Sequence, residues 1–410
     1  MTPATPATAG TTTSVQHADP DRATHLLVDE ALPADWPDRT FLTSPAWLAM
    51  MGDRPPGRGL FFRLTRGGRT LAATTGYLVE DPDCYESFNP HDLLWRDPPV
   101  FPDQPPPTGP APERTASFPC LVLVQPGYDC AVLTEGPPDT AAHRVRELLD
   151  AVTDWARRAG AVRAAVLYAS GAALTRALDD APAWHRHPGT VRSVLDLPEG
   201  VSGADGFDAY VAGLTKTSRQ KVRWDLRDLS RAGVRTALAD AAAPGDHEVA
   251  LRMNLIGKYG GYSHRDVERA RLDRLLALYP PDRFRLFHCT SARGDVVGFS
   301  LFLTHHDQWH VFWCGFDYAD PASRGTYFDA MFYAPVRAAL AEGVRSIDYG
   351  LGYERSKKWR GCHGARRDLW TTDLTDSAPG PRREPPTRRE PGGRAPHPDS
   401  PSDQHRLEHG

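Results

Sequence analysis

The chain has 410 residues, of which 40% are hydrophobic and 24% are charged, and its formal net charge is −4 at pH 7. This composition is typical of a globular protein with apolar residues for about two to three cores, and it excludes a fibrous or wholly disordered chain. The sequence has no apolar run of membrane-spanning length, and its six cysteines form no C-x-x-C pair. We therefore expect a cytoplasmic protein without a membrane span, a disulfide framework or a bound metal.

The N-terminal half begins with residues 1–25, which are rich in Thr, Ala and Pro and have neither a basic opening nor an apolar stretch. We expect this segment to be disordered and not to be a secretion signal. The patterns that follow predict a hairpin of strands 60–65 and 70–79, strands 120–124 and 130–134, a helix over 140–160 and a strand over 161–168.

Two segments are rich in proline. Residues 80–117 contain ten prolines, which interrupt regular structure and predict a long insertion within the first half. Residues 377–410 contain eight prolines and only three apolar residues. We expect this second segment to be a disordered tail, because it cannot bury enough apolar surface to offset the entropy of ordering.

The second half has clearer periodicity. A helix is predicted within residues 214–234, and Ser263 is the predicted N-cap of a helix over 265–279. The remaining elements are predicted as three antiparallel strands 283–290, 296–304 and 309–316, a helix over 326–342 and a buried strand over 345–349.

Both halves thus share one order of elements, an antiparallel meander followed by a helix and a strand. The helix exits are also alike, with Gly160 in the first half and Gly343 in the second. We expect an α/β fold with a mixed sheet built from tandem units, residues 26–190 and 191–376, of which the second is catalytic. Two unrelated α+β domains remain the alternative.

Two motifs relate this order to a known superfamily. Residues 214–234 read LTKTSRQKVRWDLRDLSRAGV, and residues 348–361 read DYGLGYERSKKWRG, in which a Gly-rich strand exit leads to Lys-x-x-Arg-Gly. The first is similar to a Fem-type stretch, where K-T-R opens a helix that ends in a basic residue and Gly-Val. The chain therefore resembles GNAT-superfamily acyltransferases, and in tandem form the FemAB-like group, over about residues 35–374.

The resemblance implies an acyltransferase that joins an activated acyl group to an amine and holds no cofactor. Members that use CoA bind its pyrophosphate on a Gly-rich turn, whereas the corresponding link here, residues 322–328, has one glycine followed by bulky side chains. This departure favours aminoacyl-tRNA as the donor, with acyl-CoA as the alternative. The acceptor is an amine on a small molecule or a peptide, and neither composition nor motif indicates a DNA partner.

Basic residues gather in two windows. Residues 216–235 hold seven basic and two acidic residues, and residues 354–367 hold six basic and one acidic residue, on an otherwise acidic chain. A helix would align four arginines at i, i+4 spacing, which favours either an anionic ligand or a solvated face. The predicted phosphate-binding residues in these windows are Lys216, Arg219, Arg223, Lys358 and Arg360.

The catalytic candidates follow the strand exit of the second half. By resemblance, Lys357 stabilises the oxyanion or orients the donor's 3′ end. Tyr349 and Tyr353 flank the glycine bend, and either could protonate the leaving group. Asp129 in the first half is a candidate base for the acceptor amine. Structural roles remain the alternatives for all four residues.

A short polar loop completes the predicted site. Lys258, Tyr259 and Tyr262 surround a glycine pair and are candidates to line the substrate, unless the segment is only a turn. The histidines and cysteines fit no zinc pattern, so we interpret them as structural. A non-catalytic binding protein with the same fold remains the competing interpretation, and it predicts ligand binding without turnover.

Overall fold

The computed structural model describes residues 13–16, 24–52, 54–106, 110–201, 203–239, 244–259, 261 and 263–375. These residues belong to one compact unit. The predicted tail, residues 377–410, lies outside the described residues.

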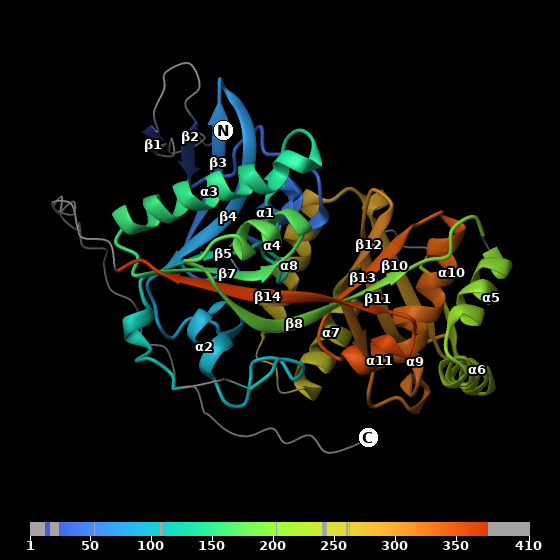
Figure 1. The fold of residues 1–410 in the computed structure, drawn as a ribbon. Coiled ribbons are helices and arrows are strands. Elements are labelled where there is room, and N and C mark those ends of the chain that lie inside the picture. The colour runs from blue at the N-terminus through green and yellow to red at the C-terminus, as the bar shows by residue number, and fades with distance from the viewer. Residues whose placement is uncertain are drawn as a thin grey trace, which may run out of the picture. The chain divides into compact units, whose positions relative to one another are not determined.

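One mixed sheet of 14 strands runs through the described residues, in the order β1-β2-β3-β4-β5-β7-β14-β8-β13-β12-β11-β10-β9, with β6 paired to β4 (Figure 1). The strands are β1 (Thr13–Gln16), β2 (His25–Asp29), β3 (Arg58–Arg66), β4 (Arg69–Val79), β5 (Cys120–Leu123), β6 (Leu133–Thr134), β7 (Arg163–Ala169), β8 (His185–Asp196), β9 (Arg235–Leu238), β10 (Phe284–Thr290), β11 (Val296–His305), β12 (Gln308–Phe316), β13 (Ser346–Leu351) and β14 (His363–Asp373).

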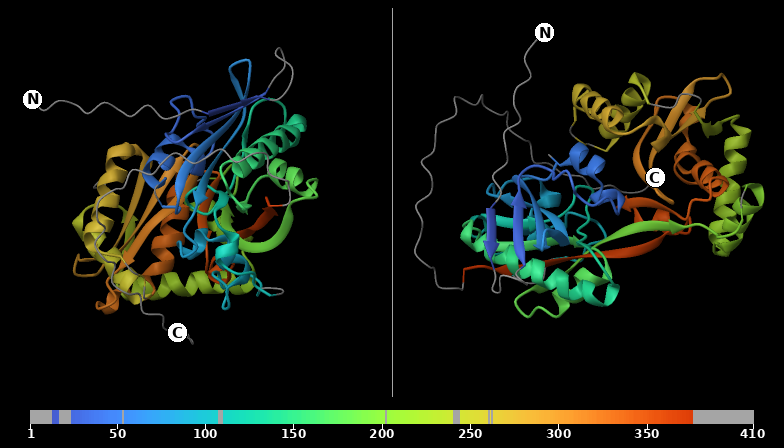
Figure 2. Two further views of the ribbon diagram at one scale, coloured as in Figure 1. Left: turned by 90° about the vertical axis from the view of Figure 1, so that its left-hand side faces the viewer. Right: turned by 90° about the horizontal axis from the view of Figure 1, so that it is seen from above.

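The helices lie on the faces and ends of this sheet. They are α1 (Pro45–Met51), α2 (Pro90–Trp95), α3 (Pro138–Arg158), α4 (Ala172–Asp179), α5 (Gly203–Gly213), α6 (Lys216–Arg231), α7 (Asp246–Lys258), α8 (Arg265–Leu278), α9 (Thr326–Phe328), α10 (Ala334–Ala341) and α11 (Glu354–Lys358). Figure 2 shows the long helix α3 beside β2, β3 and β4, with which it is in contact.

The predicted repeat is present in the sheet topology. In the first half β3, β4 and β5 are antiparallel, α3 follows, and β7 pairs in parallel with β5. In the second half β10, β11 and β12 are antiparallel, α9 and α10 follow, and β13 pairs in parallel with β12. The fold is therefore a mixed α/β sheet of two similar halves, as the order of elements predicts.

The two halves exchange their last strands. Strand β14 from the end of the chain pairs with β7 of the first half, while β8 pairs with β13 of the second half, and β8 and β14 pair with each other. The predicted boundary between residues 190 and 191 consequently falls inside β8.

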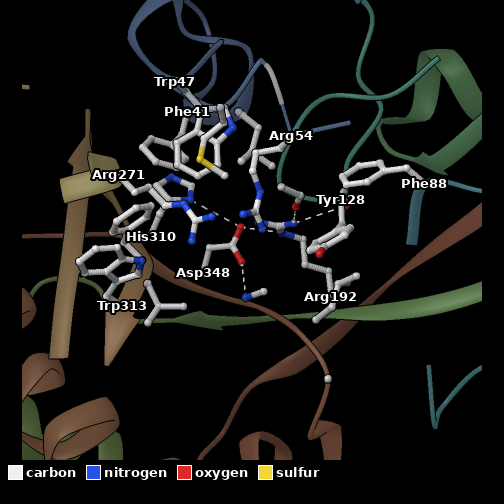
Figure 3. A pocket seen from close by; sticks show the side chains of 18 of the residues that line it. Phe41, Trp47, Arg54, Phe88, Tyr128, Arg192, Arg271, His310, Trp313 and Asp348 are labelled. Carbon is white, nitrogen blue, oxygen red and sulfur yellow. Dashed lines mark hydrogen bonds and ion pairs between the residues drawn. The ribbon is translucent and has the colours of Figure 1, made fainter. Parts of the chain in front are cut away.

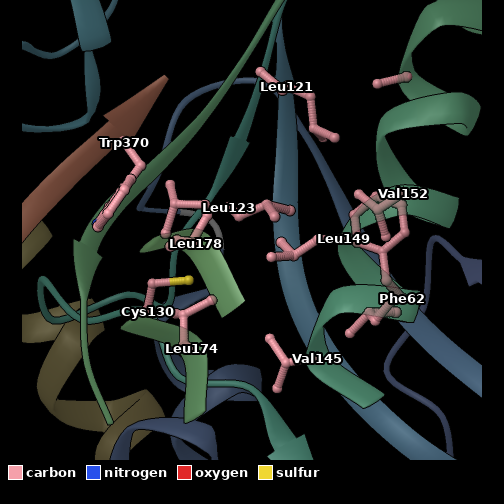
Figure 4. Packing of buried hydrophobic residues seen from close by; sticks show 14 of the residues in the cluster. Phe62, Leu121, Leu123, Cys130, Val145, Leu149, Val152, Leu174, Leu178 and Trp370 are labelled. Carbon is pink, nitrogen blue, oxygen red and sulfur yellow. The ribbon is translucent and has the colours of Figure 1, made fainter. Parts of the chain in front are cut away.

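A first core lies between α3 and the N-terminal strands (Figure 4). Buried residues recur on α3 at i, i+3 and i+4 spacing, including Val145, Leu149 and Val152. They pack in one cluster with Phe62 from β3 and with Trp370 from β14. A residue near the end of the chain thus completes the core of the first half.

Two further cores cover opposite faces of the second half. Leu301 and Leu303 of β11 pack in one cluster with residues of α7 and α8. Phe302, between them, packs in another cluster with α10, because successive strand side chains point to opposite faces. Gly315 of β12 permits the close approach of α7, since a Cβ there would lie 2.4 Å from the backbone N of Arg252.

Several elements differ from their predicted form. Strand β1 lies inside residues 1–25, where no order is predicted, because its four residues pair with the edge of β2. Of the predicted strand 130–134, only Leu133–Thr134 form a strand, β6. The predicted helix 326–342 contains a π-helical segment, Asp329–Tyr333. Ser263 is not the N-cap of α8, because its hydroxyl donates to Glu268 instead.

Candidate active site

The two parallel strands β12 and β13 pair only over their first residues. Their register ends at the pair His310 and Asp348, after which the strands separate. A cavity of about 370 Å³ opens where they separate, in the size range of small-molecule sites (Figure 3). Its walls come from both halves, including α1, the loop after β5, α7, α8 and the exit of β13.

A buried ion pair forms the floor of this cavity. Arg192 of β8 donates from Nε to Asp348 Oδ2 at 2.7 Å, and its Nη1 donates to the carbonyl oxygen of Gly127 at 2.8 Å. The other carboxylate oxygen of Asp348 accepts from the backbone N of Gly350 at 2.8 Å. Burial would raise the pKa of Asp348, but Arg192 and His310 outweigh it and hold that pKa well below its usual range.

His310 stands beside this pair with an unusual environment. Its side chain is 9% exposed, and its Nδ1 lies 3.6 Å from Asp348 Oδ2. Neither ring nitrogen has a hydrogen-bond partner among the described residues. The ring stacks on Phe41, with centroids 4.0 Å apart. Burial lowers the pKa of His310 and outweighs the opposite effect of Asp348, and the charge of Arg192 lowers the pKa further, which favours the neutral imidazole.

Three further arginines reach the cavity from its other wall. Arg271 of α8 donates to Glu268 Oε1 at 2.6 Å, and Arg252 of α7 lies 3.6 Å from Glu268 Oε2. Figure 3 shows Arg54 and Arg271 pointing into the cavity. Burial lowers the pKa of Arg271, and the charges of Arg54 and Arg252 lower it further. The three guanidinium groups are therefore close enough to repel one another.

Aromatic rings make up much of the remaining wall. One set comes from the Pro-rich insertion and the loop after β5, where Phe88 stacks on Tyr128 with centroids 5.3 Å apart. A second set comes from α1 and β12, where Trp47 and Trp313 line the cavity. The insertion is thus part of the site, and Asp103 within it also accepts from the backbone N of Val191 in β8.

Lys357, the first predicted catalytic residue, is buried beneath the exit of β13. Its Nζ donates to the carbonyl oxygens of Tyr349, Gly350 and Leu351 at 2.8, 3.1 and 2.8 Å. All three ammonium hydrogens are thus engaged. Burial lowers the pKa of Lys357 to about 8. The amine fixes the backbone that borders the cavity and does not line the cavity itself.

Arg360 joins the two basic windows. It is 1% exposed, and its Nη2 donates to Asp225 Oδ2 of α6 at 2.9 Å. Tyr333 of the π-helical segment donates to the same oxygen at 2.6 Å. The structure therefore brings the predicted windows together through an internal ion pair, and Arg360 is not free to contact a phosphate.

The other basic residues of α6 have different surroundings. Arg219 donates to the carbonyl oxygens of Ala212 and Leu214 at the end of α5, at 3.0 and 2.6 Å. Lys216 and Arg223 are exposed, as is Trp224 next to Arg223, with 64% of its surface accessible. This face of α6 is basic, aromatic and open to solvent.

Aromatic residues outside the cavity form a second exposed group. Tyr353 follows the β13 exit and is 67% exposed, and its ring centroid lies 6.3 Å from that of Tyr259. Lys258 Nζ lies 3.9 Å from the ring centroid of Tyr318. The structure thus brings together the predicted residues Lys258, Tyr259 and Tyr353.

The remaining predicted residues fall elsewhere. Tyr349 is buried against Phe332, with ring centroids 4.3 Å apart. Asp129 accepts from Arg367 Nε and Ser170 Oγ, both at 2.8 Å, so its carboxylate is occupied. Lys358 is exposed on α11. Tyr262 lies outside the described residues.

Sequence reasoning missed the charged residues of the cavity. The residues that line it without having been predicted are Arg54, Arg192, Arg252, Arg271, His310 and Asp348. An available signal was the acidic residue Asp348 on an otherwise buried strand. The others come from separate elements, and no local motif connects them.

Other kinds of site find little support in the described part of the chain. None of its helices is long and apolar enough to cross a membrane, and it contains no group of three or more His, Cys, Asp or Glu residues placed to hold a metal ion. Burial raises the pKa of Cys289 and of Cys362 to about 12, so these thiols stay protonated near neutral pH.

Residues 216–358 match the family model described as the acetyltransferase (GNAT) domain. The match begins at the first residue of α6 and ends at the last residue of α11. It includes the pair β12 and β13 whose separation opens the cavity. This segment is therefore similar to GNAT acetyltransferase domains. The separation of β12 and β13 lies within the segment that matches this acyltransferase family model.

Comparison with solved structures finds similar folds at low sequence identity. FemX is 10% identical, with 82% of this chain and 93% of that chain covered and a TM-score of 0.49. A tandem GNAT protein from the clavulanic acid biosynthesis pathway is 13% identical, with 81% and 95% covered and a TM-score of 0.42. L-PGS from Bacillus licheniformis is 11% identical, with 80% and 86% covered and a TM-score of 0.44. No curated protein matches the chain significantly.

Proposed function

We propose that this GNAT domain transfers an aminoacyl group from aminoacyl-tRNA to an amine acceptor that binds in the cavity between the two halves. The observation that carries the proposal is His310, a buried imidazole whose two ring nitrogens have no hydrogen-bond partner among the described residues. It lies at the separation of β12 and β13, where an acceptor amine could meet an acyl carbonyl.

In the proposed reaction His310 is the general base. The acceptor amine attacks the carbonyl carbon of the ester, a C–N bond forms, and the imidazole takes the proton that the nitrogen loses. The C–O bond to the ribose then breaks, and the departing oxygen takes up a proton. Asp348 stabilises the imidazolium formed in the reaction, and the ion pair with Arg192 holds this carboxylate in place.

Lys357 has a positioning role in this proposal. Its amine ties three successive carbonyls at the β13 exit. Gly350 and Gly352 adopt positive φ angles of 66° and 75° there, a conformation that glycine adopts at little cost. The fixed turn gives the cavity a defined edge next to Tyr353, on which the donor's acyl end could lie.

The exposed face of α6 supports a nucleic-acid donor. Arg223 and Arg227 are exposed cations on either side of Trp224 in the sequence, and neither has a carboxylate partner among the described residues. Basic residues next to exposed aromatic rings suit a phosphate backbone and unstacked bases. The motif resemblance of α6 to Fem-type proteins points to the same FemAB-like donor class.

Transfer assays with two donors test the proposal. The protein is incubated with total aminoacylated tRNA or with a mixture of CoA thioesters, each with a pool of primary amines, and consumption of the donor is measured. We expect consumption of aminoacyl-tRNA, and a loss of about 10²-fold or more in His310→Gln. His306→Asn is the matched control, because His306 is exposed and does not line the cavity.

Each alternative has its own result. Consumption of CoA thioesters alone would replace the proposed donor with acyl-CoA while leaving the cavity chemistry in place. Binding without consumption of either donor would support the non-catalytic interpretation. Equal activity of the His310→Gln and His306→Asn variants would exclude His310 as the base.

A further inference from the structure

Charge is unevenly distributed around the cavity. Arg192 is matched by Asp348, whereas Arg252 and Arg271 share the single carboxylate of Glu268. Arg54 has no carboxylate partner among the described residues, and its side chain is open to solvent. The wall formed by Arg54, Arg252 and Arg271, hereafter the arginine wall, therefore carries surplus positive charge within the described residues.

This surplus is costly to the folded protein in the absence of a ligand. Burial lowers the pKa of Arg271, and the neighbouring charges of Arg54 and Arg252 lower it further. Glu268 is itself 1% exposed and also accepts from Ser263. A bound anion would relieve the repulsion, because guanidinium groups pair with carboxylates and phosphates through charge-assisted hydrogen bonds.

The aromatic rings specify the rest of the ligand. Arg252 lies 5.9 Å from the ring centroid of Trp313, and Trp47 lines the same cavity. Phe88 and Tyr128 form the facing aromatic wall. Flat apolar groups pack well between such rings. At about 370 Å³ the cavity takes a small molecule or one terminal residue of a larger one.

We propose that the acceptor carries an anionic group, which the arginine wall binds, and an aromatic or other flat apolar group, which lies between the cavity's rings. This inference rests on the proposed function, because it assigns the acceptor's amine to the neighbourhood of His310. A carboxylate and a phosphate would both satisfy the arginine wall. An α-amino acid with an aromatic side chain contains all three groups.

Calorimetric binding to the full chain, without any donor, tests the anion requirement. The probes are L-phenylalanine, phenethylamine, 3-phenylpropionate and phenyl phosphate, of which only phenethylamine lacks an anion. We expect at least one of the three anionic probes to bind tenfold or more tightly than phenethylamine. The comparison between 3-phenylpropionate and phenyl phosphate distinguishes the two anion sources, and either preference supports the arginine wall.

Two variants locate the binding site. Arg54→Gln should weaken binding of the preferred anionic probe at least fivefold without unfolding the protein, because Arg54 is exposed and has no described carboxylate partner. Arg269→Gln is the matched control. This arginine lies on α8, as Arg271 does, but it pairs with Asp246 and Asp273 outside the cavity. The control should bind like the unaltered protein.

The inference is overturned if no anionic probe binds, if phenethylamine binds as tightly as the anionic probes, or if Arg54→Gln and Arg269→Gln have equal effects. These outcomes are separate from failure of the proposed function. Loss of transfer in His310→Gln without anion preference would retain the enzyme and reject this acceptor class. Anion binding that depends on Arg54, without transfer from any donor, would do the reverse.

Discussion

At the scale of single residues, the cavity holds a buried polar group with hydrogen-bond partners, Asp348, and one without such partners in the described part of the chain, His310. Asp348 accepts hydrogen bonds from Arg192 and from the backbone of Gly350. His310, next to it, has no hydrogen-bond partner for either ring nitrogen among the described residues. A buried polar group without a partner costs stability. Such a cost at the base of a cavity is typical of a group that is kept for function.

The pH dependence of transfer should reflect this environment. A general base acts only when it is neutral, and burial lowers the pKa of His310 below the usual 6.5. As pH falls, the decline in kcat/KM that comes from protonation of this base should therefore be centred below pH 6.5. A pH profile of kcat/KM for the acceptor, at saturating donor, measures this. A decline centred above pH 7 would contradict the assignment of His310.

Gly315 permits a substitution test of packing at one residue. A Cβ at this position would lie 2.4 Å from the backbone N of Arg252, so Gly315→Ala must displace α7 or β12. We expect a loss of about 1–3 kcal/mol in the free energy of unfolding, the usual cost of overpacking. Chemical denaturation measures it. Gly213→Ala is the control, because no atom lies within 4 Å of its added Cβ, and it should not destabilise the protein.

At the scale of secondary-structure elements, α6, α11 and the π-helical segment meet at one buried ion pair. Arg360 contributes the cation, and Asp225 accepts from both Arg360 and Tyr333. The guanidinium also lies over the ring of Phe328. The basic sequence windows are therefore held together by internal contacts, while the outer face of α6 stays free for a ligand.

A comparison of a single and a double variant tests this junction. Asp225→Leu alone leaves the buried guanidinium of Arg360 without its carboxylate, and we expect a loss of about 3–5 kcal/mol in the free energy of unfolding. Arg360→Leu combined with Asp225→Leu should cost less than Asp225→Leu alone, because no buried charge is then unpaired. Urea denaturation of both variants gives the comparison. If the double variant is the less stable, the junction does not act as a buried ion pair.

Helix α7 is attached to β10 by a contact that depends on pH. Burial would raise the pKa of Glu248, but hydrogen bonds from His288 and from the backbone of Gly245 outweigh it and lower the pKa to about 2. Its contribution to stability is therefore complete above the unfolded-state pKa of 4.5 and is lost as pH falls from 4.5 toward 2. Between pH 6 and pH 3 the urea midpoint should fall more in the unaltered protein than in Glu248→Gln. Equal falls would contradict this role of Glu248.

The elements that the sequence could predict are those with local signals. Alternation identified β10, β11 and β12, and helical spacing identified α3 and α6. Strands β8 and β14 were not predicted, because they are buried by partners from the other half of the chain. The site shows the same difference: Asp348, Lys357 and Arg360 lie in a recognisable motif, whereas Arg192 and His310 meet Asp348 only after β8, β12 and β13 pair.

At the scale of the whole molecule, the exchange of last strands links the stability of the two halves. β14 lies between β7 and β8, and β8 lies between β14 and β13. The cavity depends on the same arrangement, since Arg192 of β8 reaches Asp348 of β13. Neither half has a complete sheet, nor a complete site, without the other.

This arrangement predicts that a substitution that destabilises one half also destabilises the other. Trp370 of β14 is 3% exposed and belongs to the core of the first half. Trp370→Ala should lower the free energy of unfolding by about 3–5 kcal/mol.

Because β14 also pairs with β8, and β8 with β13, amide exchange should accelerate in β4 and in β11 by the same factor. Hydrogen exchange read by mass spectrometry measures both strands in one experiment. Leu276→Ala on α8, a partly buried residue that packs on a core cluster without β14 residues, is the control for a milder loss. If hydrogen exchange accelerates in β4 and stays unchanged in β11, the two halves unfold independently. The pairing of β8 with β14 would then not couple the stability of the two halves.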